Sequence, residues 1–332
     1  MSSLDLTPAV ARDRGMRDWR PWAVALGLLV VLMAAPLFVY PLLVMKIMCF
    51  ALFAAAFNLL FGFTGLLSFG HAAFFGTSAY ITAHMIKDWG LGPAAGMAAG
   101  ILAATLLGVV IGAIAIRRQG VYFSMITLAL SQLVYFVFLQ APFARGEDGI
   151  QGVPRGDFLG LIPLSDPRVL YVFVSVVFVA ALFAIWRIVN SPFGTILKAI
   201  KENENRAMSM GYSVTRYKLA IFLLSASLTG LAGALKVIVF QFVTLTDVIW
   251  QTSGEPILMT LIGGIGTMAG PVVGAAIVVV TQNQLATSPL PVTLVTGMIF
   301  ILCVLLFRRG VVGEILASRA WKRLVAGGSR SA

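Results

Sequence analysis

Long apolar runs, separated by short polar or charged stretches, dominate this chain. A helix needs about 20 consecutive apolar residues to cross a bilayer, and most of the runs have that length. The pattern predicts an all-α, polytopic transmembrane helical bundle with about eight to ten spans, some of them broken or re-entrant. The predicted spans are 22–44, 45–63, 66–86, 93–116, 120–141, 169–189, 218–243, a broken region at 255–284, and 290–307.

The composition supports a membrane protein. Of the 332 residues, 59% are hydrophobic and 11% are charged, whereas soluble domains are about 45–50% apolar and about 25% charged. The net charge of +11 comes from Lys and Arg that cluster at span ends, as the positive-inside rule expects. That rule places both termini in the cytoplasm and the loop 142–168 outside. There is no array of basic and aromatic residues suited to nucleic acid, so none is expected as a partner.

Two glycine-dense segments interrupt the predicted spans. They are Gly62–Tyr80 (GFTGLLSFGHAAFFGTSAY) and Gly254–Ala275 (GEPILMTLIGGIGTMAGPVVGA). Broken segments in both halves of a membrane protein are typical of a transport pathway, because non-helical backbone is tolerated there only against protein or a water-filled cavity. The alternative is close helix packing through small residues. That second interpretation fits Gly108 and Gly112, which form a GxxxG pair.

The segment 191–211 predicts a charged amphipathic helix outside the bilayer. Ser191 is a suitable N-cap, Pro192 suits the first helical position, and Gly211 suits the end. Glu202 and Arg206 are spaced as a helical ion pair. One predicted face is apolar, and consists of Phe193, Ile196, Leu197, Ile200, Ala207, Met208 and Gly211.

This helix is expected to bind a soluble partner protein, because a simple connection between spans would be shorter. The alternative is a helix that lies on the lipid surface. The two carboxylates and two asparagines on its polar face are a poor match to anionic lipid, which favours the protein partner.

The sequence shows no enzyme signature, and no bound metal is expected. Only two histidines occur, His71 and His84, too few for a histidine metal cluster. Cys49 and Cys303 lie within apolar runs and are interpreted as buried small hydrophobic residues. The chain has no P-loop, so uphill transport would need a bound ATPase or an ion gradient. Glu255 is the single acidic residue placed to serve as an ion relay, which argues against proton coupling.

Polar residues within the spans are candidates for lining a pathway, since intramembrane polar groups usually face the bundle interior. The alternative is that each of these residues links two helices by a hydrogen bond. For His71 this alternative is favoured, because a lone histidine is more often hydrogen-bonded for packing than used as a relay. The candidates are Asn58, Thr64, Ser68, His71, Tyr122, Ser124, Thr127, Ser131, Gln132 and Thr260.

Six segments occur in the same order as in a known family. They are GFTGLLSFGHAAFFGTSAY (62–80), RRQGVYFSMITLA (117–129), GEDGIQGVPR (146–155), FGTILKAIKENENRAMSMG (193–211), KLAIFLLSASLTGLAGAL (218–235) and GGIGTMAGPVVGA (263–275). Together they resemble the membrane permease of a branched-chain amino acid ABC importer. The segments at 117–129 and 146–155 resemble its M-type (LivM-like) subunit rather than the H-type one. The resemblance covers about residues 40–310.

The resemblance implies a non-catalytic permease of the bacterial inner membrane. Its expected partners are a second, H-type permease, two cytoplasmic ATPase subunits that hold ATP-Mg, a periplasmic binding protein, an amino-acid substrate and lipid. The chain is expected to consist of a cytoplasmic arm (1–20), a permease domain (21–310) with a cytoplasmic coupling helix (191–211), and a cytoplasmic tail (311–332). The arm and the tail lie outside the resemblance. By the same resemblance, the ATPase contact is carried by Ala199, Glu202, Asn203, Glu204 and Gly211.

Branched-chain amino acids are the expected cargo. Similar permeases carry urea, short amides or aromatic acids, and the sequence leaves these solutes open as cargo. The alternative function is that of a stand-alone secondary carrier, which would transport its solute without any ATPase.

Overall fold

The computed structural model describes residues 20–286 except 38 and 161, and also residues 297, 298, 301 and 310–317. The predicted arm up to residue 19, Cys303, most of the predicted span 290–307 and the tail beyond 317 lie outside this range. The helices are α1 (Arg20–Ala34), α2 (Pro41–Thr64), α3 (His71–Lys87), α4 (Pro93–Ala115), α5 (Val121–Gln140), α6 (Pro167–Val189), α7 (Pro192–Glu202), α8 (Glu204–Ser209), α9 (Val214–Phe240), α10 (Gly254–Gly263), α11 (Gly270–Leu285) and α13 (Gly310–Ala317).

The predicted fold class is confirmed: the chain is a helical, polytopic membrane protein. Among the described residues, five helices are long and apolar enough to cross a membrane, namely α2, α4, α5, α6 and α9. Helix α3 has 17 residues, at the lower limit for a span. Residues Ala25–Ala34 of α1 and the helix α11 are apolar but shorter.

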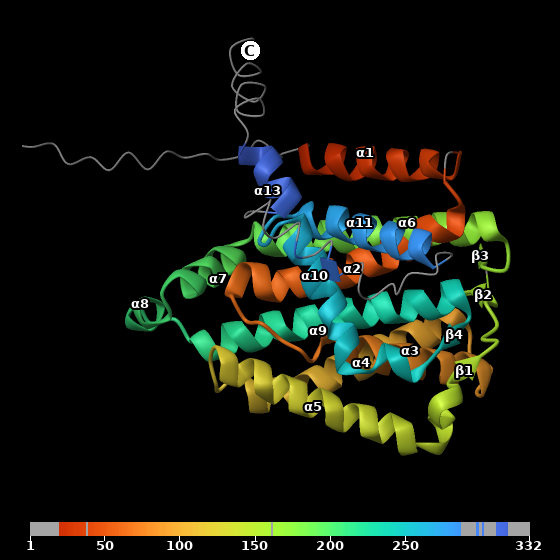
Figure 1. The fold of residues 1–332 in the computed structure, drawn as a ribbon, viewed down its shortest axis with the longest axis horizontal. Coiled ribbons are helices and arrows are strands. Elements are labelled where there is room, and N and C mark those ends of the chain that lie inside the picture. Colours follow the sequence, from red (N-terminus) through yellow and green to blue (C-terminus); the bar gives the residue numbers. More distant parts are fainter. Residues whose placement is uncertain are drawn as a thin grey trace, which may run out of the picture.

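Short irregular elements connect the helices. Strands β1 (Ile150–Gln151) and β4 (Phe242–Val243) pair antiparallel, as do β2 (Asp157–Phe158) and β3 (Ile162–Pro163). The 3₁₀ turns are η1 (Ala35–Leu37), η2 (Pro142–Ala144), η3 (Gly146–Asp148), η4 (Leu245–Asp247) and η5 (Trp250–Ser253). Figure 1 shows that the strands lie at one end of the bundle and that α7 and α8 lie at the other.

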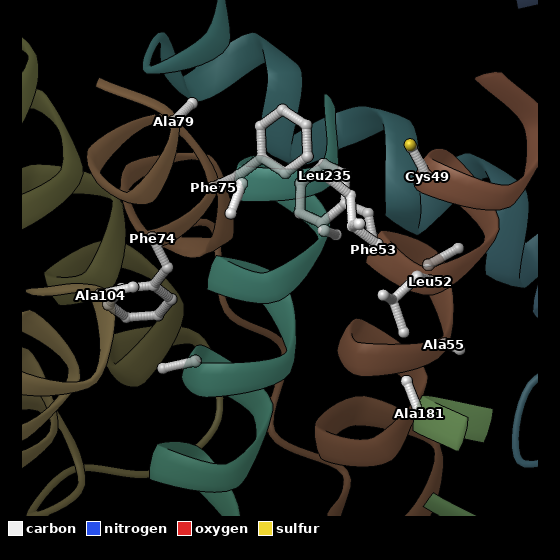
Figure 2. Packing of buried hydrophobic residues seen from close by; sticks show 14 of the residues in the cluster. Cys49, Leu52, Phe53, Ala55, Phe74, Phe75, Ala79, Ala104, Ala181 and Leu235 are labelled. Carbon is white, nitrogen blue, oxygen red and sulfur yellow. The ribbon is translucent and has the colours of Figure 1, made fainter. Parts of the chain in front are cut away.

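Helix α9 is the centre of the bundle and packs against α2, α3 and α4. Figure 2 shows Phe53 of α2, Phe75 of α3 and Leu235 of α9 meeting in the core beside Cys49. The Phe53 and Phe75 rings stack with their centroids 4.6 Å apart. Cys49 is fully buried, as predicted.

Glycines let α4 approach α9 closely. A Cβ atom added to Gly108 would lie 2.9 Å from the Cβ of Ala226, and one added to Gly112 would lie 2.9 Å from Cδ1 of Leu219. The close-packing interpretation of this GxxxG pair is therefore confirmed.

Two predicted span boundaries are wrong. The first two spans meet at Pro41 rather than at residue 45, because Pro36 and Pro41 cannot continue a helix and Pro41 instead opens α2. The third span begins at His71 rather than at residue 66. Gly65 ends α2 in the left-handed conformation (φ +76°), and the chain stays non-helical up to Gly70.

Candidate functional site

The predicted helix 191–211 is two helices, α7 and α8, so the single-helix prediction is wrong. Its start is as expected, because the Ser191 hydroxyl accepts the backbone N–H of Gly194 (3.3 Å). The break lies at Asn203, whose backbone is extended (φ −157°, ψ 103°). The Asn203 side chain accepts the backbone N–H of Arg206 (3.0 Å) and so caps α8. An asparagine can compete with the helix in this way wherever its side chain replaces a backbone partner.

The break changes which residues face the bundle. Leu197, Ile200 and Ala207 are buried as predicted, but Met208 is 48% exposed and Gly211 is also exposed. Beyond Asn203 the predicted apolar face is therefore kept at Ala207 but lost at Met208 and Gly211. The same break removes the helical spacing of the predicted Glu202–Arg206 pair.

Two lysine contacts and one aromatic stack hold this segment to the bundle. The ammonium of Lys201 donates to the carbonyl of Gly62 in α2 (2.7 Å). Lys218 of α9 pairs with Glu204 of α8 at 2.6 Å. The ring of Phe193 stacks on Tyr217 with centroids 5.6 Å apart. The sequence did not indicate either lysine contact, because the partners lie on other helices.

The predicted ATPase-contact residues are not equivalent. Glu202, Asn203 and Gly211 are exposed, whereas Ala199 and Glu204 are half-buried. Three apolar side chains at the end of α8 and just after it are also exposed. They are Met208, Met210 and Tyr212, at 48%, 56% and 39%. The segment thus presents carboxylates next to apolar side chains, a combination found at protein interfaces.

Hydroxyl groups hold the first break, residues 65–70, between α2 and α3. Ser124 and Thr127 of α5 and Ser253 of η5 supply them. Ser124 donates to the Leu67 carbonyl (2.6 Å), Thr127 accepts the Phe69 N–H (3.2 Å), and Ser253 donates to the Phe69 carbonyl (2.7 Å) and accepts the Ala72 N–H (2.9 Å). Non-helical backbone in this segment is therefore satisfied by protein groups, as membrane depth requires.

One carboxamide and close glycine packing hold the second break, residues 264–269. Asn58 of α2 donates to the Thr267 carbonyl and accepts the Gly266 N–H, both at 2.9 Å. A Cβ atom on Gly263 would lie 1.8 Å from the Gly270 carbonyl oxygen, and one on Gly274 would lie 1.8 Å from that of Met259. The backbones of α10 and α11 therefore touch, which only glycine permits.

The pathway candidates divide into bonded residues, outward-facing residues and one buried hydroxyl group. Ser131 of α5 is fully buried, and its hydroxyl has no hydrogen-bond partner among the described residues. His71 bonds Ser225 through Nε2 (2.9 Å) and lies between the rings of Phe57 and Phe74, as expected for a packing histidine. Tyr122 is 73% exposed on α5, and Gln132 on the same helix is half-buried. The buried candidates that bond neighbouring protein groups are Asn58, Thr64, Ser68, Ser124, Thr127 and Thr260.

The segment 146–155 has a structural role at the strand end of the bundle. Arg155 donates to the carbonyls of Ile238 and Val239 (3.2 and 2.8 Å), which are among the last of α9. Partial burial lowers the pKa of the Arg155 guanidinium from its ordinary value, because the charged form loses solvation. The motif therefore caps the central helix.

A buried ion pair lies nearby and was missed in the sequence. Lys236 of α9 bonds Asp247 of η4 at 2.6 Å, with the two side chains 7% and 11% exposed. No signal in the sequence pairs residues 11 positions apart across the end of a helix. This ion pair is almost free of water.

The family profile described as "Branched-chain amino acid transport system / permease component" matches residues 39–307. The chain belongs to this family. It is 26% identical over 264 residues to the High-affinity branched-chain amino acid transport system permease protein LivM of Salmonella typhimurium, covering 71% of this chain and 61% of that protein. The Escherichia coli protein of the same name is 27% identical over the same coverage.

A relative that is named for a different cargo is also similar. The Ribose import permease protein RbsC of Bacillus subtilis is 29% identical over 176 residues, covering 48% of this chain and 50% of that protein. No solved structure matches this chain significantly. The chain spans 61% of the length of the two LivM relatives, which is less than two thirds.

Proposed function

We propose that this chain is the M-type permease subunit of an ATP-driven importer, and that it carries leucine, isoleucine and valine across the bacterial inner membrane. The observation that carries the proposal is the family match over residues 39–307. The two LivM relatives support the choice of cargo.

The proposed partners belong to the same importer. A second, H-type permease completes the pore, two ATPase subunits hold ATP-Mg, and a periplasmic binding protein delivers the solute. The permease domain is 21–310, with cytoplasmic segments at 1–20 and 311–332. This chain has no catalytic step of its own in this scheme.

The ATPases are proposed to dock on α7 and α8, at Ala199, Glu202, Asn203, Glu204 and Gly211. Basic residues support the cytoplasmic placement of this end. Because α5 ends beside η2 and β1, its start lies at the α7–α8 end, as Figure 1 shows, and brings Arg117 and Arg118 there. Arg187, Arg216 and Lys218 flank α7 and α8 in the sequence.

The ribose permease relative keeps a second cargo class open within the same machine. Its similarity covers 48% of this chain, so the bundle alone is compatible with more than one solute. Urea, short amides and aromatic acids are further candidate solutes. A stand-alone carrier would need no ATPase, and only partner dependence separates it from the importer.

The first experiment is a pull-down from gently solubilised membranes with co-expressed neighbouring genes, followed by an ATPase assay. We expect a second permease and ATPases to co-purify, and leucine with its binding protein to raise ATP turnover. If ATP turnover rises only with a sugar or only with urea, that solute is the cargo and the amino-acid proposal is wrong. A chain that transports alone in liposomes would contradict the importer.

The docking residues are tested by Glu202→Ala. We expect it to weaken ATPase binding about five-fold or more, as an interface residue worth at least about 1 kcal/mol would. Glu147→Ala is the matched control, because Glu147 is also exposed but lies at the strand end. Glu204→Ala is a less direct probe, since it also removes the partner of Lys218. Unchanged co-purification of Glu202→Ala would remove Glu202 from the interface.

A further inference from the structure

Helix α7 contacts the bundle at the point where α2 ends. The ammonium of Lys201, in the last turn of α7, donates to the Gly62 carbonyl at 2.7 Å. Much of the Lys201 side chain is exposed, yet its stem runs beside Gly65, where an added Cβ atom would lie 3.6 Å from Lys201 Cγ. Lys201 therefore connects α7 to the end of α2 by a hydrogen bond.

The Gly62 carbonyl is a suitable acceptor for this cation. It is one of the last four carbonyls of α2, which have no partner within the helix. A positive charge is also favourable at a helix C-terminus, where the macrodipole is negative. The bond thus satisfies the end of α2 with a group from α7 rather than from the membrane-spanning helices.

The same turn of α2 touches the second break. A Cβ atom on Gly62 would lie 2.2 Å from Oδ1 of Asn58 and 2.9 Å from the backbone nitrogen of Gly266. No space remains between these groups, and Asn58 holds both Gly266 and Thr267 by hydrogen bonds of 2.9 Å. A shift of Gly62 must therefore displace the break 264–269 as well.

The first break begins within the same turn. Gly65, which ends α2 at φ +76°, is the first residue of the non-helical segment 65–70. Lys201 therefore lies at the start of the first break, 65–70. It is linked to the second break, 264–269, through Gly62 and Asn58. The two breaks are more than 190 residues apart in the sequence but share this contact with α7.

We propose that Lys201 is a positioning residue that transmits movement of α7 to both broken segments. The inference rests on the proposed function, in which ATPases bind and move α7 and α8. A displacement of α7 must carry the Gly62 carbonyl with it or break the bond. Movement of Gly62 is coupled to the neighbouring groups by contact, because the packing around Gly62 is close and those groups have to move with it.

The test uses the whole importer, reconstituted in proteoliposomes with its second permease, ATPases and binding protein. Lys201→Met keeps most of the side-chain stem but removes the ammonium. Lys198→Met is the matched control, since Lys198 lies on the same helix and loses the same charge, but its ammonium lies over the Phe63 ring (5.8 Å) rather than on a carbonyl. Lys201→Arg keeps a cationic donor.

The measured quantity is solute imported per ATP hydrolysed. We expect Lys201→Met to assemble and hydrolyse ATP normally but to lower this ratio by about 2- to 30-fold. Lys198→Met should leave the ratio near that of the unmodified complex, and Lys201→Arg should restore most of it.

Three results would overturn the proposal. They are an unchanged ratio in Lys201→Met, an equal loss in Lys198→Met, or failure of Lys201→Met to assemble, which would make the contact one of folding. Failure of the unmodified chain to bind any ATPase would instead overturn the proposed function.

Discussion

The two ends of the bundle hold their connecting segments in different ways. At the strand end, Arg155 caps α9 and the buried Lys236–Asp247 pair fixes η4. At the other end, α7 and α8 rest on the bundle through the buried side chains of Leu197, Ile200 and Ala207, and through Lys201 and the Lys218–Glu204 pair. Lys218 is buried, whereas Lys201 is exposed and Glu204 is 23% exposed. Helix α9 joins the two ends over 27 residues.

The difference indicates which end is built to move. Buried charge pairs cannot be separated without exposing an unpaired ion to a medium of low polarity, so the strand end has one arrangement. Lys201 and Glu204 reach water and can exchange their partners for it at little cost, which favours movement of α7 and α8. If α7 and α8 bind the ATPases, as proposed, this second kind of attachment suits them, because local opening is easiest where fewer contacts are buried.

The strand end should be the more sensitive to loss of a charge. Lys236→Met leaves Asp247 buried without its partner, and we expect a loss of about 3–5 kcal/mol of stability. Thermal unfolding of the purified chain in detergent measures it. The double variant Lys236→Met with Asp247→Leu should recover most of the loss, because no charge is then left unpaired. A single variant as stable as the original would mean that water reaches this pair.

Two glycines at positive φ sharpen the comparison further. Gly149 (φ +64°, ψ −166°) lies at the strand end, where a Cβ atom would be 2.2 Å from the Val243 carbonyl oxygen. Gly211 (φ +86°) follows α8 and has nothing within 4 Å of the same position. Gly149→Ala should therefore cost about 3 kcal/mol, whereas Gly211→Ala should cost about 1 kcal/mol from backbone strain alone.

Unfolding midpoints of the two glycine variants in the same detergent give the difference directly. Each adds one methyl group at a left-handed position, so each controls for the other. Equal losses would show that the β1–β4 contact yields as easily as open space, and the strand end would then be no more rigid than the other.

The fold could be predicted in outline because its main determinant is local. The length of an apolar run is read directly from the sequence, and so is the spacing of Gly108 and Gly112 that brings α4 onto α9. The boundaries near Pro41 and Gly65 were missed by a few residues. They depend on which of several prolines and glycines ends the helix.

The candidate site could be predicted only in part, for a related reason. Exposure of Glu202 follows from its place on the predicted polar face, but the break at Asn203 depends on one side chain outcompeting a backbone bond. The same break explains why Gly211, predicted on the apolar face, is exposed. Lys201 and Gly62 are 139 positions apart, and tertiary packing alone brings them together. The resemblance implied an ATPase contact for Glu204, and its bond to Lys218 of α9 had no signal in the sequence.

The smallest effect is expected at that last contact. Lys218→Met removes the partner of Glu204, but Glu204 is 23% exposed and can be solvated again. Global stability should therefore fall by about 1 kcal/mol or less. Locally, α8 loses a main attachment to α9, so hydrogen exchange across residues 203–213 should accelerate by about five-fold, the factor that corresponds to about 1 kcal/mol of local stability.

Arg216→Met is the matched control, because Arg216 is an exposed neighbour on the same helix. Faster exchange confined to 203–213 in Lys218→Met, with an unchanged unfolding midpoint, would fit an end that moves independently of the bundle. If instead the whole chain became less stable, α8 would be an integral part of the bundle. The strand end and the α7–α8 end would then differ in composition but not in mobility, and a rigid transfer of force along α9 would replace local movement of α7 and α8.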